Sequence, residues 1–136
     1  MQGLTGSLKY YFGYDIVPQL VNDVRSRFKD ETNCSFLEAD IVTASLAQGD
    51  AILCRDCLSH LAPDAALLAL KGFRRSGARL LLATSHRTGQ NVRINTGGWY
   101  PMDLTAAPFS LPPPLFAFAE DATKTIGVWS TADLPG

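Results

Sequence analysis

The sequence has no hydrophobic run long enough to cross a membrane and no excess of either charge. Its longest purely apolar runs, such as residues 65–70 and 80–83, fall far short of the ~20 residues that a spanning helix needs. Twelve lysines and arginines stand against thirteen aspartates and glutamates, which leaves a net charge of −1. Binding to nucleic acids and anionic membranes depends on excess positive charge, so we expect neither partner and consider small molecules and proteins instead.

Cysteine is scarce, with Cys34, Cys54 and Cys57 as the only examples. An odd number of cysteines in a chain of 136 residues favours free thiols in a reducing compartment over a disulfide framework. The first residues carry neither the charged nor the apolar segment of a secretory signal, and we therefore expect a cytoplasmic protein. A hydrophobic content of 46% and a charged content of 18% predict one globular domain over residues 1–136.

Apolar and polar residues alternate in blocks that predict strands and helices in turn. Strands are predicted at residues 10–16, 34–41, 50–55 and 78–85, with one amphipathic helix after the first strand and another after the third. The second helix is expected to begin at Pro63 and to end at Gly77. The runs 50–55 and 78–85 are compact and apolar, which is typical of strands buried on both faces of a parallel sheet.

The last third of the chain changes character. Residues 86–114 contain glycines and prolines without periodicity and predict a long loop, whose rings at Trp99, Tyr100 and Phe109 indicate docking rather than disorder. Strands are predicted at 115–119 and 125–129, and the polar stretch between them permits an antiparallel hairpin. The order of these blocks predicts an α/β fold with a mainly parallel sheet and an antiparallel C-terminal hairpin.

Three aspartates fall at the ends of successive predicted strands, namely Asp15, Asp40 and Asp56. In open α/β sheets, ligands bind beyond the carboxyl ends of the strands. A carboxylate in that position can accept hydrogen bonds from ribose hydroxyls, and a carboxylate on the next strand can accept one from an adenine amino group. The aspartates therefore outline a nucleoside pocket. The simpler interpretation is that each carboxylate caps a turn at a strand end.

Five segments follow one another in an order and at a spacing that are typical of a known family: Tyr-Phe-Gly-Tyr-Asp-Ile at 11–16, Phe-Leu-Glu-Ala-Asp-Ile at 36–41, Gly-Asp-Ala-Ile-Leu-Cys-Arg-Asp-Cys-Leu-Ser-His-Leu at 49–61, Ser-Gly-Ala-Arg-Leu-Leu-Leu at 76–82, and Gly-Trp-Tyr-Pro-Met-Asp-Leu at 98–104 with Ala-Pro-Phe at 107–109. On these segments, and over about residues 10–129, the chain resembles the class I, Rossmann-like S-adenosylmethionine-dependent methyltransferases.

This resemblance implies a methyl-transfer activity and a set of site residues. Asp15 would hold the ribose of S-adenosylmethionine, and Asp40 with Ile41 would contact its adenine. The resemblance also implies that three residues lie on the catalytic, substrate side: Arg55, Asp56 and His60. It leaves the methyl acceptor open, as a small molecule or a protein.

One part of the family pattern has no counterpart in the sequence. The family's first strand and its Gly-x-Gly-type loop receive the methionine part of the cofactor, and nothing before Tyr10 matches them. We therefore expect a methyltransferase fold without its first strand, and weak or lost cofactor binding. The alternative is a non-catalytic, homo-oligomeric binding or assembly module on the same fold.

The absent strand would lie between the strands at 10–16 and 50–55. Unpaired strand edges are templates for pairing with another chain. We therefore expect a homodimer that buries the apolar side of Tyr10, Tyr11 and Phe12. The aromatic loop at residues 99–109 is a second candidate surface.

Cys54 and Cys57 have the C-x-x-C spacing of redox motifs, and His60 is a further potential metal ligand. Cys54 falls inside a predicted strand, whereas reactive pairs lie at helix N-termini, and structural zinc needs four ligands. We predict reduced thiols and no bound metal. For Arg55 with Asp56 the simpler interpretation is a local ion pair, and for His60 a packed side chain bonded to a backbone carbonyl.

Overall fold

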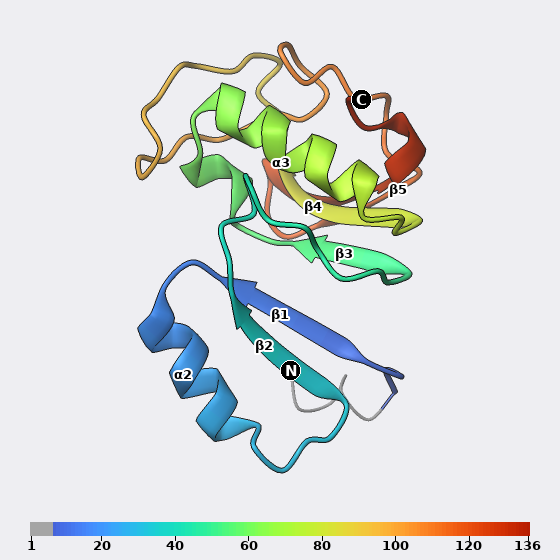
Figure 1. Cartoon of the computed structure of the whole chain (residues 1–136). Coiled ribbons are helices and arrows are strands. Elements are labelled where there is room, and N and C mark those ends of the chain that lie inside the picture. The colour runs from blue at the N-terminus through green and yellow to red at the C-terminus, as the bar shows by residue number, and fades with distance from the viewer. Residues whose placement is uncertain (1–6) are drawn as a thin grey trace. The chain divides into compact units, whose positions relative to one another are not determined.

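The computed structural model describes residues 7–136 and confirms all six predicted strands and both predicted helices (Figure 1). In chain order the elements are β1 (Tyr11–Asp15), α2 (Pro18–Arg27), β2 (Cys34–Glu38), β3 (Ala51–Cys54), the 3-10 turn η1 (Leu58–His60), α3 (Pro63–Arg75), β4 (Leu80–His86), β5 (Phe116–Ala119), β6 (Lys124–Ser130) and the 3-10 turn η2 (Thr131–Asp133). No helix of the described residues is long and apolar enough to span a membrane.

The chain divides into two compact units, a smaller one that ends at Ala47 and a larger one that begins at Gln48. In the smaller unit, β1 and β2 pair in parallel. In the larger unit the strand order is β3-β4-β6-β5, with β3 and β4 parallel and β6 antiparallel to both of its neighbours. This is the predicted α/β fold with its antiparallel C-terminal hairpin.

Two strands have only one partner each. Among the described residues, β1 pairs with β2 alone and β3 pairs with β4 alone. These are the two strands between which the resemblance places the family's first strand, and no strand within residues 7–136 takes that position. The break in strand pairing therefore falls where the sequence predicts it.

The core of the smaller unit is a cluster of rings under α2. Proline in the first turn starts the helix, where its missing N–H costs no hydrogen bond. Val21 is 2% exposed on this helix, and the Phe28 ring that follows it lies 5.6 Å from the ring of Phe36. The Tyr11 ring lies 5.9 Å from the Phe36 ring and is tilted by 54° to it. Gly13 leaves room for Phe36, since a Cβ at position 13 would meet the Phe36 ring.

The opposite face of this two-stranded sheet carries exposed apolar side chains. Tyr10, Phe12 and Leu37 are 46%, 39% and 40% exposed, and the rings of Tyr10 and Phe12 lie 4.6 Å apart. Tyr11 does not join them, because successive side chains of a strand point to opposite faces. The expectation that Tyr10, Tyr11 and Phe12 share one surface is therefore wrong for Tyr11.

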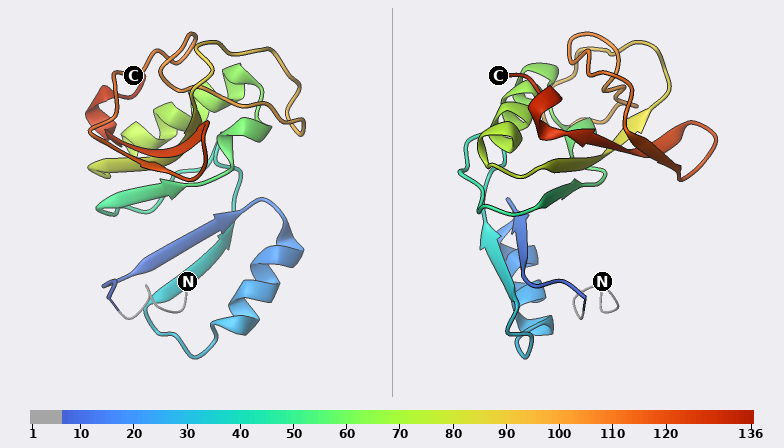
Figure 2. Two further views of the ribbon diagram at one scale, coloured as in Figure 1. Left: turned by 180° about the vertical axis from the view of Figure 1, so that it is seen from behind. Right: turned by 90° about the vertical axis from the view of Figure 1, so that its right-hand side faces the viewer.

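In the larger unit, α3 covers one face of the four-stranded sheet (Figures 1 and 2). The helix begins at Pro63 as predicted, and Gly77 follows its end with a φ of 80° that favours glycine. The buried side chains come from α3, from β4 and β6, and from the loop after β4: Ala66, Ala69, Leu70, Phe73, Leu81, Ala83, Trp129, Tyr100, Met102, Leu104, Phe109 and Leu111.

Two burial predictions are wrong. The strand at 50–55 is not buried on both faces, because Leu53 is 63% exposed and only Cys54 is buried within β3. Leu53 points to the face opposite α3, which no helix of the larger unit covers. Tyr100 and Phe109 do not form an exposed aromatic surface, since both belong to the core and only Trp99 is exposed.

A substitution at Gly127 tests how tightly the core of the larger unit is packed. A Cβ at position 127 would collide with the ring of Trp129, which is 1% exposed and has no room to move. We expect Gly127→Ala to lower the free energy of unfolding by about 1–3 kcal/mol, measured by urea denaturation. Gly49→Ala is the matched control, because a Cβ at Gly49 would meet nothing within 4 Å. Equal stability of the two variants would contradict this packing.

Candidate functional site

The two carboxylates predicted to bind a nucleoside lie in the smaller unit, at the same end of its sheet. Asp15 is the last residue of β1 and pairs with Glu38 at the end of β2. Asp40 comes two residues after Glu38. The amide of Ala39, between them, donates a hydrogen bond to the carbonyl of Asp15 at 2.9 Å. Because β1 and β2 are parallel, both carboxylates lie at the carboxyl edge, as the sequence predicts.

Each carboxylate also holds the turn that follows it. Oδ1 of Asp15 accepts a hydrogen bond from the Val17 amide at 2.8 Å, and Oδ1 of Asp40 accepts one from the Val42 amide at 2.9 Å. These are the turn contacts that the simpler interpretation expects. Among the described residues, these bonds engage one oxygen of each carboxylate. Ile41, which follows Asp40, is half-buried.

Arg55 and Asp56 belong to a cluster of four charged side chains in the larger unit. Arg55 Nε lies 2.8 Å from Glu120 Oε1 and Arg55 Nη1 lies 3.5 Å from Asp56 Oδ2. Lys124 Nζ completes the cluster, at 2.6 Å from Asp56 Oδ1 and 3.1 Å from Glu120 Oε2. The predicted pair of Arg55 with Asp56 is thus present, but its closer partners come from the β5–β6 hairpin.

The cluster fixes the charge of its carboxylates. Hydrogen bonding from Lys124 lowers the pKa of Asp56, and hydrogen bonds from Arg55 and then Lys124 lower the pKa of Glu120. Neither carboxylate is therefore suited to take up a proton at neutral pH. Asp56 adopts a left-handed φ of 51° after β3, and its amide donates to Thr84 Oγ1 at 2.8 Å. The cluster thus ties the turn after β3 to β4 and the hairpin.

His60 joins η1 to the long loop. Its Nδ1 lies 2.9 Å from the carbonyl oxygen of Gly98, and its own carbonyl accepts from the Gly97 amide at 2.8 Å. The Tyr100 amide donates to the Ser59 carbonyl beside it at 3.2 Å. The bond to a backbone carbonyl is the one that the simpler interpretation expects, but His60 is exposed and not packed in the core.

Asp103 organises the loop, and sequence reasoning missed it. Its carboxylate is 4% exposed and accepts hydrogen bonds from the amides of Thr88, Gly89 and Thr105 and from the Thr105 hydroxyl, at 2.7 to 3.2 Å. Burial favours a higher pKa for Asp103, but these hydrogen bonds outweigh it and lower the pKa. Asn91 adds a second link, since its Oδ1 accepts from the Asp103 amide at 2.8 Å. The loop is therefore tightly held despite its lack of helix or strand.

The cysteines of the C-x-x-C pair form no disulfide, and Cys54 is buried. Two effects raise the pKa of the Cys54 thiol well above its usual range: a hydrogen bond with Cys57, which is the larger effect, and burial. A raised pKa disfavours the thiolate that a redox or metal-binding cysteine requires. No group of three or more histidine, cysteine or acidic side chains suited to a metal occurs in the part of the chain that the structure describes.

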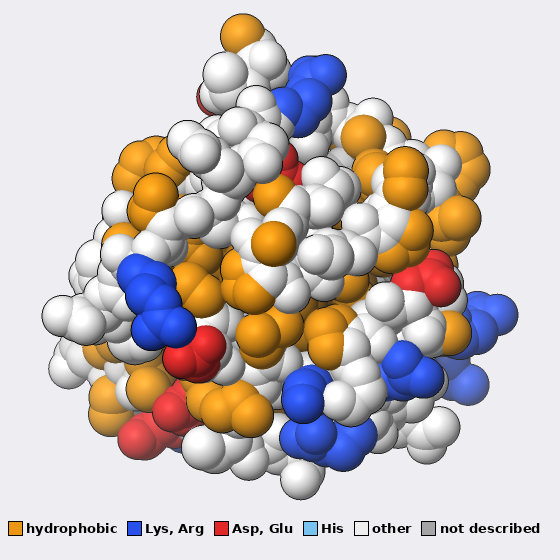
Figure 3. Space-filling view, turned by 90° about the horizontal axis from the view of Figure 1, so that it is seen from above, with side chains coloured by type: hydrophobic (Ala, Val, Ile, Leu, Met, Phe, Trp, Pro, Cys, Tyr) orange, Lys and Arg blue, Asp and Glu red, His pale blue; other side chains and the backbone are white. Residues whose placement is uncertain are grey.

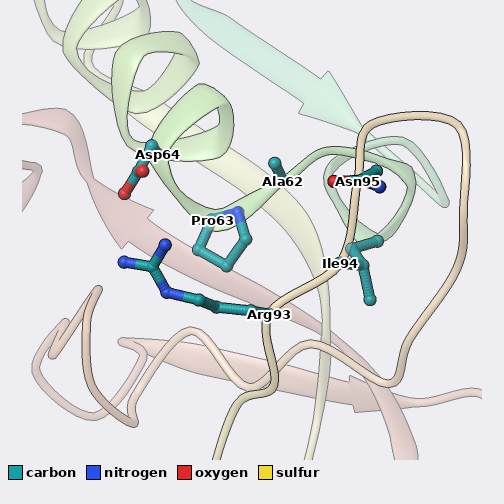
Figure 4. Close-up of a pocket in the computed structure, with 6 residues that line it drawn as sticks. All are labelled: Ala62, Pro63, Asp64, Arg93, Ile94 and Asn95. Carbon is teal, nitrogen blue, oxygen red and sulfur yellow. The ribbon is translucent and has the colours of Figure 1, made fainter.

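A groove of about 350 Å³ lies between the start of α3 and the loop at residues 93–95 (Figure 4). Asp64 and Arg93 bring opposite charges to it, and Pro63 lines it beside them. None of the predicted site residues lines this groove. On the molecular face shown in Figure 3, lysine and arginine side chains are scattered among acidic, hydrophobic and uncharged ones.

No protein-family model matches the sequence, and comparison with curated proteins gives no match. Solved structures do match the fold. Magnesium protoporphyrin IX methyltransferase from Synechocystis PCC 6803, solved with bound S-adenosylmethionine, superposes on 94% of this chain with a TM-score of 0.68 at 12% sequence identity. The N-methyltransferase NodS from Bradyrhizobium japonicum WM9 matches with a TM-score of 0.64 over 94% of this chain at 18% identity.

This chain has the fold of the S-adenosylmethionine-dependent methyltransferases. The methyltransferase domain of a bacterial Hen1 protein agrees, with a TM-score of 0.66 and 13% identity over 92% of this chain. The chain spans 62% of the magnesium protoporphyrin IX methyltransferase structure, 75% of NodS and 80% of the Hen1 domain. The predicted family fold is confirmed, while the similarity at these identities concerns the fold alone.

Asp103 gives a testable consequence for the loop. Asp103→Asn keeps the shape of the side chain but replaces one carboxylate oxygen, which accepts hydrogen bonds, with an NH2 group, which donates them. This NH2 group would face backbone amides that also donate. We therefore expect the free energy of unfolding at pH 7 to fall by about 2–4 kcal/mol. A lowered pKa contributes stability above the usual aspartate pKa and loses it as the pH falls through the lowered value. Urea unfolding of both proteins at pH 7 and pH 2.5 should therefore show a difference that shrinks in acid. A difference independent of pH would contradict this role.

Proposed function

We propose that this chain is a methyltransferase-like protein whose smaller unit recognises the nucleoside part of S-adenosylmethionine. The observation that carries the proposal is the pair of carboxylates, Asp15 and Asp40, at the same end of two adjacent parallel strands in a methyltransferase fold. Each has one oxygen engaged in its own turn, and in this proposal the other accepts a hydrogen bond from a ligand. These carboxylate oxygens are hydrogen-bond acceptors, and they fit the donors that a ribose offers with its hydroxyls and an adenine with its amino group.

In this proposal, residues of the smaller unit bind the cofactor and position it. Asp15 accepts hydrogen bonds from the ribose hydroxyls, while Asp40 and Ile41 contact the adenine. The cofactor would supply an electrophilic methyl group on its sulfonium. Methyl transfer needs chiefly an acceptor held in line with that group, so the protein's contribution is orientation.

We place Arg55, Asp56 and His60 on the acceptor side by the same proposal. Each has partners within the larger unit, so their role there is to hold loops in place rather than to move a proton. Asp56 and Arg55 fix the turn after β3 through the charged cluster, and His60 fixes the long loop. The acceptor is a small molecule or a protein.

We further propose that the chain by itself binds the cofactor weakly. The described residues supply carboxylates for the nucleoside, but they include no strand with a glycine-rich loop to receive the methionine carboxylate and amine. Three cysteines without a disulfide are consistent with action in the reducing cytoplasm.

The second candidate is a non-catalytic, homo-oligomeric binding or assembly module on this fold. Two observations favour it: the acceptor-side residues all have partners already, and β1 and β3 each leave one edge unpaired among the described residues. The two candidates differ in whether any nucleoside binds.

Calorimetric titration of the purified chain with S-adenosylhomocysteine separates these candidates. We expect a Kd of about 100 μM or weaker, and we expect Asp15→Ala to weaken it by at least about tenfold, as for the loss of a hydrogen bond to a charged group. Asp23→Ala is the matched control, because Asp23 is an exposed aspartate on α2 whose hydrogen bond within residues 7–136 is to Gln19 of the same helix.

Three outcomes of this titration test the weak binding, the role of Asp15 and the choice between the two candidate functions. A Kd in the low micromolar range would show that the described residues suffice and that weak binding is wrong. Equal binding by the Asp15→Ala variant and the parent would remove Asp15 from the site. No heat at millimolar ligand would favour the non-catalytic module.

A further inference from the structure

His86 is a buried titratable side chain at the carboxyl end of β4, and the proposed function gives it no role. It is 6% exposed, and its backbone amide donates to the Met102 carbonyl oxygen at 2.8 Å. The hydrogen bond of its ring within residues 7–136 joins Nδ1 to the same carbonyl oxygen at 3.3 Å. A carbonyl oxygen only accepts, so in the neutral ring Nδ1 carries the proton and Nε2 presents a lone pair.

The Nε2 atom of His86 is open to solvent. Among the described residues, the fully enclosed polar side-chain atom without a hydrogen-bond partner is the hydroxyl of Tyr100, and Nε2 of His86 is not enclosed in this way. Met102 therefore fixes the ring while one acceptor atom stays within reach of a ligand. The parallel strands β3 and β4 both end at this edge, and ligands of open α/β sheets bind beyond the carboxyl ends of the strands.

The ring of Trp99 lies beside this acceptor. Its centroid is 5.9 Å from that of the His86 ring, and the two planes are at 87°. Trp99 is 57% exposed, yet its backbone is fixed on both sides. His60 Nδ1 bonds to the Gly98 carbonyl at 2.9 Å, and the Tyr100 amide donates to a carbonyl of η1 at 3.2 Å. An exposed indole on a fixed backbone offers a stacking surface that a ligand need not order.

The charges around His86 cancel one another. His86 lies opposite Lys124 in the β4–β6 register. The Lys124 ammonium is 2.6 Å from Asp56 and 3.1 Å from Glu120, and Arg55 bonds to Glu120 at 2.8 Å. Two cations and two anions therefore compensate each other beside the ring. The surroundings suit a neutral molecule that has a planar apolar surface and a hydrogen-bond donor.

We propose that His86 and Trp99 form a binding site for a neutral aromatic small molecule that carries a hydroxyl, with phenol as the simplest case. The aromatic ring of the ligand lies on the indole of Trp99, and its hydroxyl donates a hydrogen bond to Nε2 of His86. Rings in contact have centroids about 4.5–7 Å apart, so a substituent of a ring on Trp99 can reach the imidazole. Phenols of this kind are then the methyl acceptors, a step that rests on the proposed function, whereas their binding does not.

NMR titration of the chain with phenol, in the absence of cofactor, tests this site. The two tryptophans give separate indole N–H signals, and Trp129, which is 1% exposed, is the internal reference for Trp99. We expect phenol to shift the Trp99 signal with a Kd in the millimolar range. Phenol should bind at least about threefold more tightly than anisole, which lacks the donor, and than cyclohexanol, which lacks the aromatic ring.

Two variants assign the contacts. His86→Phe loses the acceptor nitrogen but keeps a ring, so phenol should bind no better than anisole, and anisole binding should not change. Trp99→Leu should weaken the binding of both compounds at least about threefold, because both stack on the indole. Phe116→Leu is the matched control, since Phe116 is a 68% exposed ring that pairs with Val128 on β6 rather than with the end of β4. Far-UV circular dichroism checks that each variant is folded.

A second measurement covers the case in which His86→Phe does not fold. In long-range proton–nitrogen NMR spectra of the parent chain, phenol should shift the Nε2 resonance of His86 more than the Nδ1 resonance. Equal binding of phenol and cyclohexanol would overturn the site, as would a Trp99 signal that phenol leaves unchanged at about 20 mM. Binding of S-adenosylhomocysteine without a response to phenol would reject this site and leave nucleoside recognition standing. The reverse result would reject nucleoside recognition and leave the phenol site.

Discussion

The pairing of strand edges is the constraint on which this structure depends. A strand must satisfy its backbone amides and carbonyls, and β1 and β3 each do so on one side only among the described residues. Strands β4 and β6, in contrast, have neighbours on both sides and carry the most deeply buried core. The break between β1 and β3 leaves a small unit built on one helix and two strands, and a larger unit with its own hydrophobic core.

The polar groups that matter for the proposed function are divided between the two units. The carboxylates of Asp15 and Asp40 depend only on β1, β2 and their turns, so the smaller unit holds both groups suited to a nucleoside. The charged cluster around Arg55 and the buried Asp103 depend only on the larger unit, where they hold the turn after β3 and the long loop. Nucleoside recognition is thus proposed for one unit and acceptor positioning for the other.

Local patterns were enough to predict the elements and the strand-end carboxylates. The position of Asp15 and Asp40 follows from where apolar runs stop, which is visible in the sequence. Long-range partners were not visible: Arg55 meets Glu120 from 65 residues away, and only the β5–β6 register brings it there. The prediction that the strand at 50–55 is buried on both faces was wrong at Leu53, because an apolar run does not show which face of a sheet a helix covers. Asp103 was missed since its partners are backbone amides, which leave no side-chain pattern.

Amide hydrogen exchange, followed by NMR, tests the divided sheet most directly. Amides that are paired within a sheet open only when the surrounding unit unfolds, so their protection reports the stability of that unit. We expect the amides of β4 and β6 to exchange at least about a hundredfold more slowly than those of β1 and β2. Equal protection of β1 and β4 would show one cooperative sheet and would contradict the division between β1 and β3.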